Sequence, residues 1–550
     1  MKKNLTVWNL FSVVILAAFA LFIMYPIFLI LYRSVIHGDT GALTLQNFAH
    51  FFAKKFYWGT MVNSLKVTVV STILSAALGL PLAYLMRSVK IKGSSFLNIL
   101  IVISYLSPPF IGAYAWIQML GRQGVITQFL NDTFGLHYGG VYGFAGIVLV
   151  FTLQSFPLVY IYVSGALKNL DNSLNEAAES LGCSRMGRIW KIIVPLVMPT
   201  LLASSMLVFM RVFADFGTPM LIGEGYKTLP VLIYNQFMGE VSGDDGFAAA
   251  ICCIVIGLTI VMFFVQRFLA GRNTYAMTAL KPMAAESLSG LRNILAHLAV
   301  YMVVGLAILP QFVVVYTSFL ATNGGQVFTG GFAFQSYDAT LFAKDNDVIW
   351  HTYFLGLCAI TAVLVLGVLI AYLSVRKRNT LNSILDVITM FPFIIPGSVL
   401  GIAFVFAFNK SPIILTGTSL IMIISFAVRR MPYTVRSSTA ILGNISPSIE
   451  EAAISLGASD MTTFRKITVP MMMPGVLSGA IMSWVTIISE LSSSIILYTN
   501  STQTLTVSIY TEVIRGNYGN ASAYATILTV TSILSLLLFY KVTGRRDVSV

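Results

Sequence analysis

The chain has 550 residues, of which 57% are hydrophobic and only 10% are charged. Soluble domains carry about a quarter charged residues, and so few charges cannot cover the apolar surface of a globular protein of this length. Composition therefore excludes that class and favours a lipid bilayer. The basic residues that give the net charge of +13 lie between hydrophobic runs. We therefore expect them to set the membrane topology and predict no nucleic-acid partner. Four cysteines and five histidines show no metal-ligand spacing, so no disulfide, metal or bound cofactor is predicted.

Long apolar runs follow one another along the whole chain. A helix rises 1.5 Å per residue, so about 20 apolar residues cross the hydrocarbon core. Unpaired backbone groups are too costly in lipid, so continuous runs of this length are helical. The sequence predicts an all-α polytopic membrane protein. Its twelve predicted spans cover residues 10–33, 60–86, 96–120, 142–167, 196–221, 246–270, 294–320, 351–375, 382–408, 417–441, 471–497 and 522–541.

The basic residues orient these spans. The first run follows Lys2 and Lys3 and is longer than the apolar part of a signal peptide, so we interpret it as an uncleaved span. With both termini placed in the cytoplasm, most Lys and Arg fall on that side, in loops such as 87–92 and 185–191. The positive-inside rule therefore predicts a multi-pass membrane protein with both termini cytoplasmic.

The chain contains an internal repeat. The segment 176–199 matches 451–474 at 14 of 24 positions, with an offset of 275 residues. Each half has six predicted spans and returns to its starting side, so the halves are parallel repeats with a pathway expected between them. We predict a first repeat over 1–270 with its repeated loop at 173–199, a cytoplasmic linker over 271–293, and a second repeat over 294–550 with its loop at 448–474.

The repeated loop has the pattern of a short amphipathic helix. Ser173 and Ser448 stand three residues before a glutamate, which is typical of a capping box, so a helix is predicted to start at each serine. Gly182 and Gly457 stand where a helix-terminating glycine with positive φ belongs. Ser184 and the matching Ser459 are predicted caps for the helix that follows. A helix of this kind could pack on its own protein, but two copies favour docking on two identical partner subunits.

Glu-Ala-Ala, then glycine four residues on and two later prolines, resembles the EAA loop of ATP-binding-cassette (ABC) importer permeases. The whole chain resembles the fused two-repeat permeases of ferric-iron importers, and segments 108–116 and 213–223 add to this likeness. The resemblance implies the type I importer fold, two copies of an ABC ATPase subunit and an extracytoplasmic solute-binding protein. It implies that 174–182 and 449–457 are coupling helices, with the motif residues Glu176, Ala177, Ala178, Gly182, Glu451, Ala452, Ala453 and Gly457.

The energy source is expected to lie outside this chain. No GxxxxGK[ST] segment occurs in the sequence, so ATP is expected to be hydrolysed by the partner ATPase. The chain itself is not predicted to be an enzyme.

Ionisable residues inside spans are costly and usually face a pathway or a partner. Asp215 and Glu490 stand 275 residues apart in the fifth span of each half, and an acidic path would suit a hard cation such as ferric iron. The alternative is a local pair between Asp215 and Arg211, four residues earlier. Arg429 and Arg430 in the tenth span could pair with acidic residues or attract an anionic substrate.

Alternative functions remain open from the sequence. The same machinery could carry 2-aminoethylphosphonate, thiamine, sulfate or a polyamine. A secondary transporter is less consistent, because the loop 86–93 after the second span lacks the acidic residue of the major-facilitator signature. A membrane transferase or protease is also disfavoured, since no nucleophile–base pair stands out.

Overall fold

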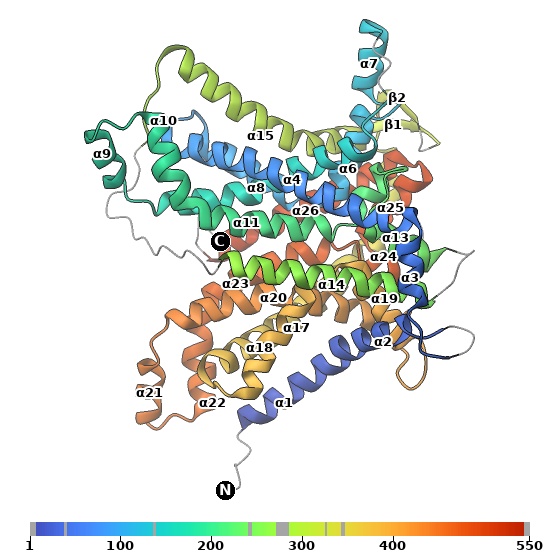
Figure 1. Cartoon of the computed structure of the whole chain (residues 1–550), viewed down its shortest axis with the longest axis vertical. Helices are drawn as coiled ribbons and strands as arrows, with labels where there is room; N and C mark the ends of the chain where they lie inside the picture. Colours follow the sequence, from blue (N-terminus) through green and yellow to red (C-terminus); the bar gives the residue numbers. More distant parts are fainter. Residues whose placement is uncertain are drawn as a thin grey trace. The chain divides into compact units, whose positions relative to one another are not determined.

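Helices form nearly all of the chain in the computed structural model, which describes residues 7–37, 41–135, 139–239, 245–270, 285–324, 327–342 and 347–543. The helices gather into two compact units (Figure 1). Unit 1 comprises Met1–Phe51, Ile233–Ile256 and Gln335–Arg546, and unit 2 comprises Phe52–Leu232, Gly257–Phe334 and Asp547–Val550. The predicted linker 271–293 lies outside the described residues as far as residue 284.

Unit 2 is built around helix α8, and 78% of the apolar window of α8 is buried. Helices α4 and α11 pack along α8, and α15 packs against α5 and α6. The elements of unit 2 are α4 (Lys55–Ser88), α5 (Ser94–Leu106), α6 (Pro109–Leu120), α7 (Val125–Phe134), α8 (Gly143–Lys168), α9 (Ser173–Ser180), α10 (Arg185–Arg188), the π-helical turn η2 (Ile189–Ile193), α11 (Val194–Phe213), α12 (Gly217–Ile222), α15 (Gly290–Ser318) and the antiparallel strands β1 (Leu320–Asn323) and β2 (Val327–Phe332).

Unit 1 is built around α17, α20 and α23, which pack on one another. Its elements are α1 (Val7–Phe19), η1 (Ala20–Met24), α2 (Tyr25–Ser34), α3 (Gln46–Ala53), α16 (Gln335–Leu341), α17 (Val348–Arg376), α18 (Thr380–Ile394), α19 (Gly397–Phe408), α20 (Ser419–Asn444), α21 (Ser448–Ser455), α22 (Asp460–Thr463), η3 (Phe464–Thr468), α23 (Val469–Ile488), α24 (Ser494–Leu497), η4 (Asn500–Thr502), α25 (Leu505–Arg515) and α26 (Tyr518–Thr543). Helices α13 (Leu229–Met238) and α14 (Asp245–Ala270) contribute residues to both units.

Nine helices of the described chain are long and apolar enough to cross a membrane. Two further helix pairs are apolar enough together but bend sharply, by 99° between α5 and the segment Pro109–Phe134 and by 110° between α18 and α19, as a broken span or a re-entrant loop does. Pro108 and Pro396 stand at these bends, and the residue before each proline is extended, because proline disfavours a helical conformation in the residue before it. The remaining predicted span, the tenth (417–441), corresponds to α20, which is 26 residues long but polar for a span because it carries three arginines.

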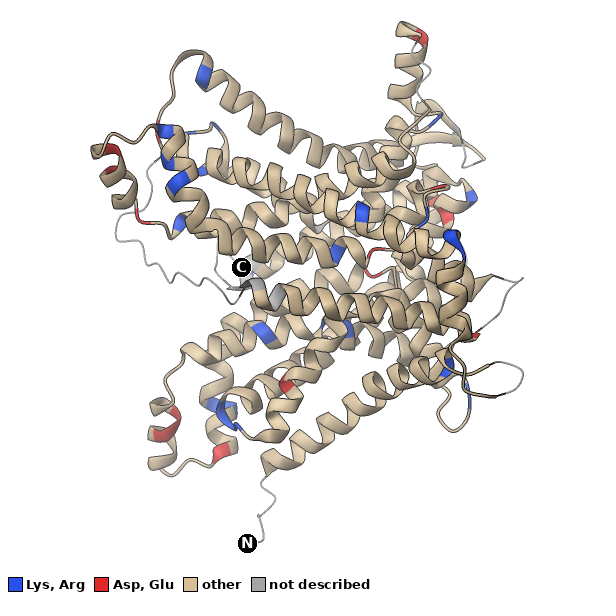
Figure 2. Ribbon diagram, in the orientation of Figure 1, with Lys and Arg blue, Asp and Glu red and all other residues tan. Residues whose placement is uncertain are grey.

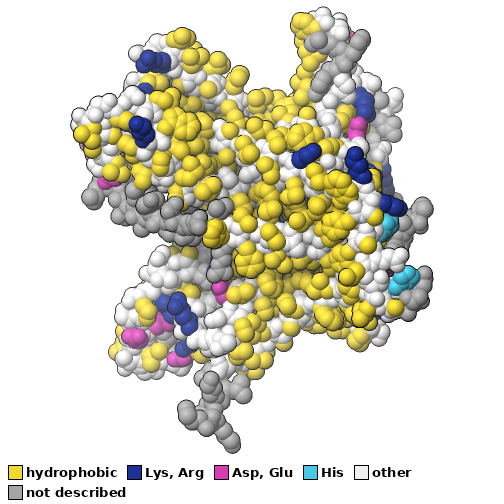
Figure 3. Space-filling view, in the orientation of Figure 1, with side chains coloured by type: hydrophobic (Ala, Val, Ile, Leu, Met, Phe, Trp, Pro, Cys, Tyr) yellow, Lys and Arg dark blue, Asp and Glu magenta, His cyan; other side chains and the backbone are white. Residues whose placement is uncertain are grey.

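Hydrophobic side chains cover the flanks of the spanning helices on the visible face (Figure 3). Val365 of α17 is 64% exposed and Leu538 of α26 is 63% exposed. Side chains of this kind would be costly in water but are stable against lipid tails. The structure therefore confirms the predicted class, an all-α membrane protein, and adds one β-hairpin that the apolar pattern did not indicate.

The first helix of each repeat packs with helices of the other repeat. In unit 1, α1 lies against α18, and α2 lies against α19. In unit 2, α15 lies against α5 and α6. The packing units therefore differ from the sequence repeats. Unit 1 includes α1 and α2 of the first repeat, and unit 2 includes α15 of the second repeat.

Candidate coupling segments and intramembrane charges

The first repeated loop folds into two short helices joined by a tight turn. Helix α9 ends where the Gly182 N–H donates to the Glu179 carbonyl (2.9 Å) and the Cys183 N–H donates to the Ala178 carbonyl (2.9 Å). This pair of bonds is the Schellman ending, which needs a left-handed residue after the helix. Gly182 supplies it with φ of 78°, so the predicted positive φ is confirmed.

The second repeated loop has the same construction. The Gly457 N–H donates to the Ile454 carbonyl (2.9 Å), the Ala458 N–H donates to the Ala453 carbonyl (3.1 Å), and φ of Gly457 is 89°. The next helix in each loop begins at a predicted cap. Ser184 Oγ accepts the Gly187 N–H and Ser459 Oγ accepts the Thr462 N–H, each at 3.2 Å.

The predicted capping boxes at Ser173 and Ser448 are wrong. Each serine is already the first residue of its helix, preceded by Asn172 or Pro447 in helical conformation. A hydroxyl one residue inside the helix cannot receive the N–H groups that a capping residue receives. The N–H of each serine is itself bonded upstream: Asp171 Oδ1 accepts the Ser173 N–H (2.9 Å), and Ser446 Oγ accepts the Ser448 N–H (3.4 Å).

The two coupling segments differ in burial. No residue of α9 is buried, whereas Glu450 and Ala453 of α21 are buried. Arg376 at the end of α17 holds the second segment: its Nε donates to Glu450 Oε1 (2.9 Å) and its Nη2 donates to the Ile445 carbonyl (2.6 Å). The first repeat has Asn175 in the place of Glu450. In Figure 2 the charged residues of unit 1 gather at the end of α17 and α20 where α21 and α22 lie.

The motif residues of both helices leave a surface that a partner can contact. Glu176 and Ala177 are exposed on α9, Glu451 and Ala452 are exposed on α21, and Ala178 is half-buried. After each helix comes an apolar side chain with almost no cover: Leu181 is 87% exposed and Leu456 is 90% exposed.

In unit 1 the structure brings Glu490, Arg429 and Arg430 together. Glu490 lies two residues beyond the end of α23 and is 3% exposed. One carboxylate oxygen accepts from Arg429 and the other accepts from Arg430, both on α20. The Ser493 N–H (3.2 Å) and hydroxyl (3.3 Å) also donate to Glu490 Oε1. The cluster therefore buries two positive charges on one negative charge.

Glycine at the start of α19 makes room for this cluster. A Cβ on Gly397 would lie 2.4 Å from Arg429 Nη1 and 2.7 Å from Ser492 Cβ. Within the described part of the chain, the buried Nε–H groups of Arg429 and Arg430 have no hydrogen-bond acceptor. Pairing with an acidic residue, one of the two predicted alternatives for these arginines, is thus what the structure contains.

In unit 2 Asp215 and Arg211 make separate contacts. Helix α11 ends at Phe213, so Asp215 lies beyond the helix and its Oδ1 accepts the Thr218 N–H of α12 (2.9 Å). The helical spacing that would place the two side chains on one face is lost at that end. The Arg211 guanidinium instead lies 4.7 Å from the centre of the Tyr105 ring. A role of these residues in a pathway stays a prediction.

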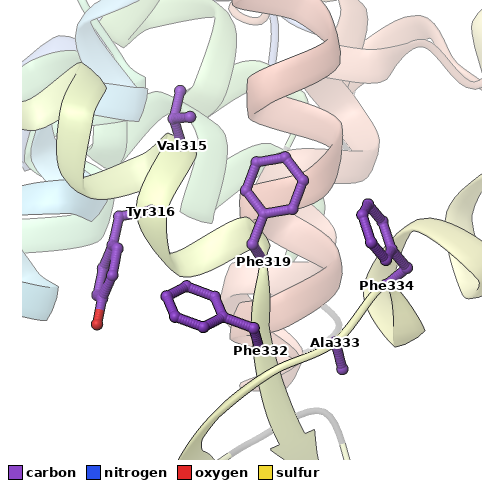
Figure 4. Close-up of a pocket in the computed structure, with 6 residues that line it drawn as sticks. All are labelled: Val315, Tyr316, Phe319, Phe332, Ala333 and Phe334. Carbon is purple, nitrogen blue, oxygen red and sulfur yellow. The ribbon is translucent and has the colours of Figure 1, made fainter.

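A separate hollow of about 270 Å³ lies at the end of α15 beside β2 (Figure 4). Its walls are Val315, Tyr316, Phe319, Phe332, Ala333 and Phe334. Because no charged side chain lines it, this hollow offers no ligand set for a metal cation.

The fold and the two repeated loops define a multi-span membrane permease with an internal repeat. The family model described as "Binding-protein-dependent transport system inner membrane component" matches the chain twice, over 75–275 and 363–546. The chain belongs to this family of ABC importer permeases. Permeases of such importers work with an ATPase and a substrate-binding protein.

Similar proteins with curated names include ferric transport permeases. The chain is 30% identical to the "Ferric transport system permease protein FbpB" of Actinobacillus pleuropneumoniae, over 97% of this chain and 78% of that protein. It is 29% identical to the "Putative ferric transport system permease protein FbpB 1" of Haemophilus influenzae, over 90% and 78%. A chain from a solved bacterial ABC transporter involved in alginate import covers 48% of this chain and 96% of its own length, with 16% identity and a TM-score of 0.39.

Proposed function

We propose that the chain is the permease of an ATP-driven importer of ferric iron. Two copies of an ABC ATPase dock on α9 and α21 from the cytoplasm, and an extracytoplasmic binding protein delivers the solute. Both termini lie in the cytoplasm. The observation that carries the proposal is the pair of near-identical exposed segments, one in each repeat, which a pair of identical subunits can bind.

Iron is favoured because three curated relatives with ferric names match 87–97% of the chain at 25–30% identity. Relatives with other named solutes match less of it: a 2-aminoethylphosphonate permease of Salmonella choleraesuis matches 48% of the chain and a molybdenum permease of Escherichia coli matches 39%. A relative that matches both repeats is the better indicator of the solute, because both repeats are expected to form the pathway.

We assign the motif residues Glu176, Ala177, Ala178 and Gly182, with Glu451, Ala452, Ala453 and Gly457, to the ATPase contact. Closure of the ATPases on ATP would draw the two segments together and rock the repeats, exposing the pathway alternately to either side. We assign Asp215 and Glu490 with Arg211, Arg429 and Arg430 to the pathway. The repeats would take the boundaries 1–270 and 294–550.

The second candidate solute is a phosphonate, and one observation favours it. The cluster of Arg429, Arg430 and Glu490 carries an excess positive charge, which suits an anion better than a bare cation.

The test is to purify the tagged chain from its native membrane, identify the ATPase and binding protein that accompany it, and measure solute uptake by the complex in proteoliposomes. Uptake of ferric iron that requires ATP and the binding protein is expected. Uptake of 2-aminoethylphosphonate without iron uptake would replace iron by the second candidate, and uptake without any ATPase would overturn the importer itself.

A further inference from the structure

We propose that Trp8 is a positioning residue for coupling, because it fastens α22 and η3, which directly follow the proposed coupling helix α21, to helix α1. In the described part of the chain no equivalent indole contact holds α10 and η2, so the two segments transmit force unequally. This inference rests on the coupling role proposed for α9 and α21.

Trp8 joins three elements of unit 1. Its side chain is 6% exposed, and its Nε1–H donates to Asp460 Oδ2 of α22 (3.4 Å). Its ring centre lies 4.8 Å from that of Tyr372 on α17 and 5.4 Å from that of Phe464 in η3. The Tyr372 and Phe464 rings are themselves 4.6 Å apart. Tilted and edge-on ring contacts at these distances stabilise beyond simple burial, so α1, α17 and the second coupling segment share one aromatic cluster.

An ion pair closes the cluster on its exposed side. Lys377 Nζ lies 2.8 Å from Asp460 Oδ2, the oxygen that also receives the indole N–H. The same ammonium lies 5.7 Å from the centre of the Trp8 ring, within the range of a cation–π contact. Asp460 is the first residue of α22, where the helix dipole favours a carboxylate. One carboxylate therefore ties the start of α22 to both α1 and α17.

Helix α1 is held on the same side by further hydrogen bonds. Ser12 Oγ donates to Asn382 Oδ1 of α18 (2.6 Å), and Asn379 Nδ2 donates to Asn9 Oδ1 (3.3 Å). Trp8, Asn9 and Ser12 thus form a contact strip along the first turns of α1. A displacement of α22 would be passed to α1 through Trp8, and to the rest of unit 1 through this strip.

The first segment is attached differently in unit 2. The position equivalent to Asp460 is Arg185, and the position equivalent to Phe464 is Ile189. Arg185 Nη2 lies 3.7 Å from Glu286 Oε2, with side chains 42% and 67% exposed. Exposed pairs of this kind contribute little because water and salt screen them. When Pro26 of α2 is aligned with Pro310 of α15, Arg292 at the start of α15 stands in the place of Trp8.

The experiment measures solute transported per ATP hydrolysed by the complete complex of permease, ATPase and binding protein in proteoliposomes. Trp8→Ala is expected to lower this ratio several-fold while ATP hydrolysis continues, and Trp8→Phe to retain most of it by keeping the ring contacts. Trp350→Ala is the matched control, because Trp350 is 64% exposed at the opposite end of α17 and its loss should leave the ratio unchanged.

A second arm covers failure of Trp8→Ala to assemble. Lys377→Asp and Asp460→Lys should each lower the ratio, and the double variant should recover part of it, which a general packing defect would not do. An unchanged ratio in Trp8→Ala, or no recovery in the double variant, would overturn the role of Trp8. If Trp8→Ala leaves the ratio unchanged while Gly457→Val lowers it, α21 has the coupling role but Trp8 does not contribute to it. If neither variant lowers the ratio, the coupling role of α21 is itself wrong.

Discussion

Glu490 neutralises only one of the two guanidinium groups that contact it, so the charge balance of the cluster depends on which residue is removed. Replacing Glu490 leaves two buried positive charges without an anion. Replacing Arg430 leaves a matched pair between Arg429 and Glu490. Because an unpaired buried charge is far more costly than a paired one, the two single variants should differ even though each removes one charged group.

Glu490→Gln is therefore expected to destabilise the purified protein strongly, by about 3–5 kcal/mol, and Arg430→Gln by clearly less. The measurement is the thermal unfolding midpoint in one detergent, with Arg436→Gln as control, because Arg436 is on the same helix and its side chain is 54% exposed. Equal midpoints for the Glu490 and Arg430 variants would show that the excess charge is balanced by a group outside this cluster.

At the scale of an element, each coupling helix depends on the glycine that ends it. Gly182 and Gly457 have positive φ, and a Cβ at either position would meet no atom within 4 Å. A valine there would pay no steric penalty from neighbours, and its whole effect would come from the backbone, about 1–2 kcal/mol for a left-handed residue with a side chain. The turn would shift and reorient Leu181 or Leu456.

Gly182→Val and Gly457→Val are each expected to reduce ATP-dependent uptake several-fold with little change in the amount of folded protein. Gly443→Val is the matched control, since Gly443 also has open space around it but lies inside α20 without positive φ. Asparagine tolerates the left-handed region, so Gly457→Asn should retain most uptake. Normal uptake in both valine variants would contradict the coupling role.

Apolar length was enough to predict most elements, and local chemistry was enough to predict the turns. The runs that became α8, α15 and α17 could be read directly because their hydropathy stays high enough over the length of a span. Pro108 and Pro396 are visible inside two other runs, but a proline fixes only a local conformation. Bends of 99° and 110° depend on tertiary packing, which no single run encodes.

The contacts of the candidate site were harder to predict, because they join distant parts of the chain. Glu490 lies 60 residues from Arg430, and Trp8 lies 452 residues from Asp460. Neither pair leaves a periodic signal in the sequence. The repeat offset gave a partial clue: Glu450 and Phe464 have no equivalent in the first repeat, where Asn175 and Ile189 stand, and such differences mark where the two halves diverge.

At the scale of the whole molecule, the basic loops predict one orientation in the membrane. A green fluorescent protein fused to the carboxyl terminus should fluoresce, because it folds in the cytoplasm, and alkaline phosphatase at the same point should be inactive. Alkaline phosphatase fused after residue 139, in the loop between α7 and α8, should be active. The reverse pattern of activities would show that the topology is inverted. Helices α9 and α21 would then lie outside the cell, where no ATPase could reach them.

The exchange of first helices between the repeats has a consequence for synthesis. The span Val7–Ser34 is synthesised before the other described spans, yet two of the helices against which it packs, α18 and α19, begin only at Thr380, 346 residues beyond Ser34, or later. At 5–20 residues per second, translation takes roughly 20–70 s to produce them. Helix α15, in contrast, meets α5 and α6 already in place. This early span is thus among the last of the described helices to meet its neighbours, and a chain that stops after residue 270 leaves both packing units incomplete.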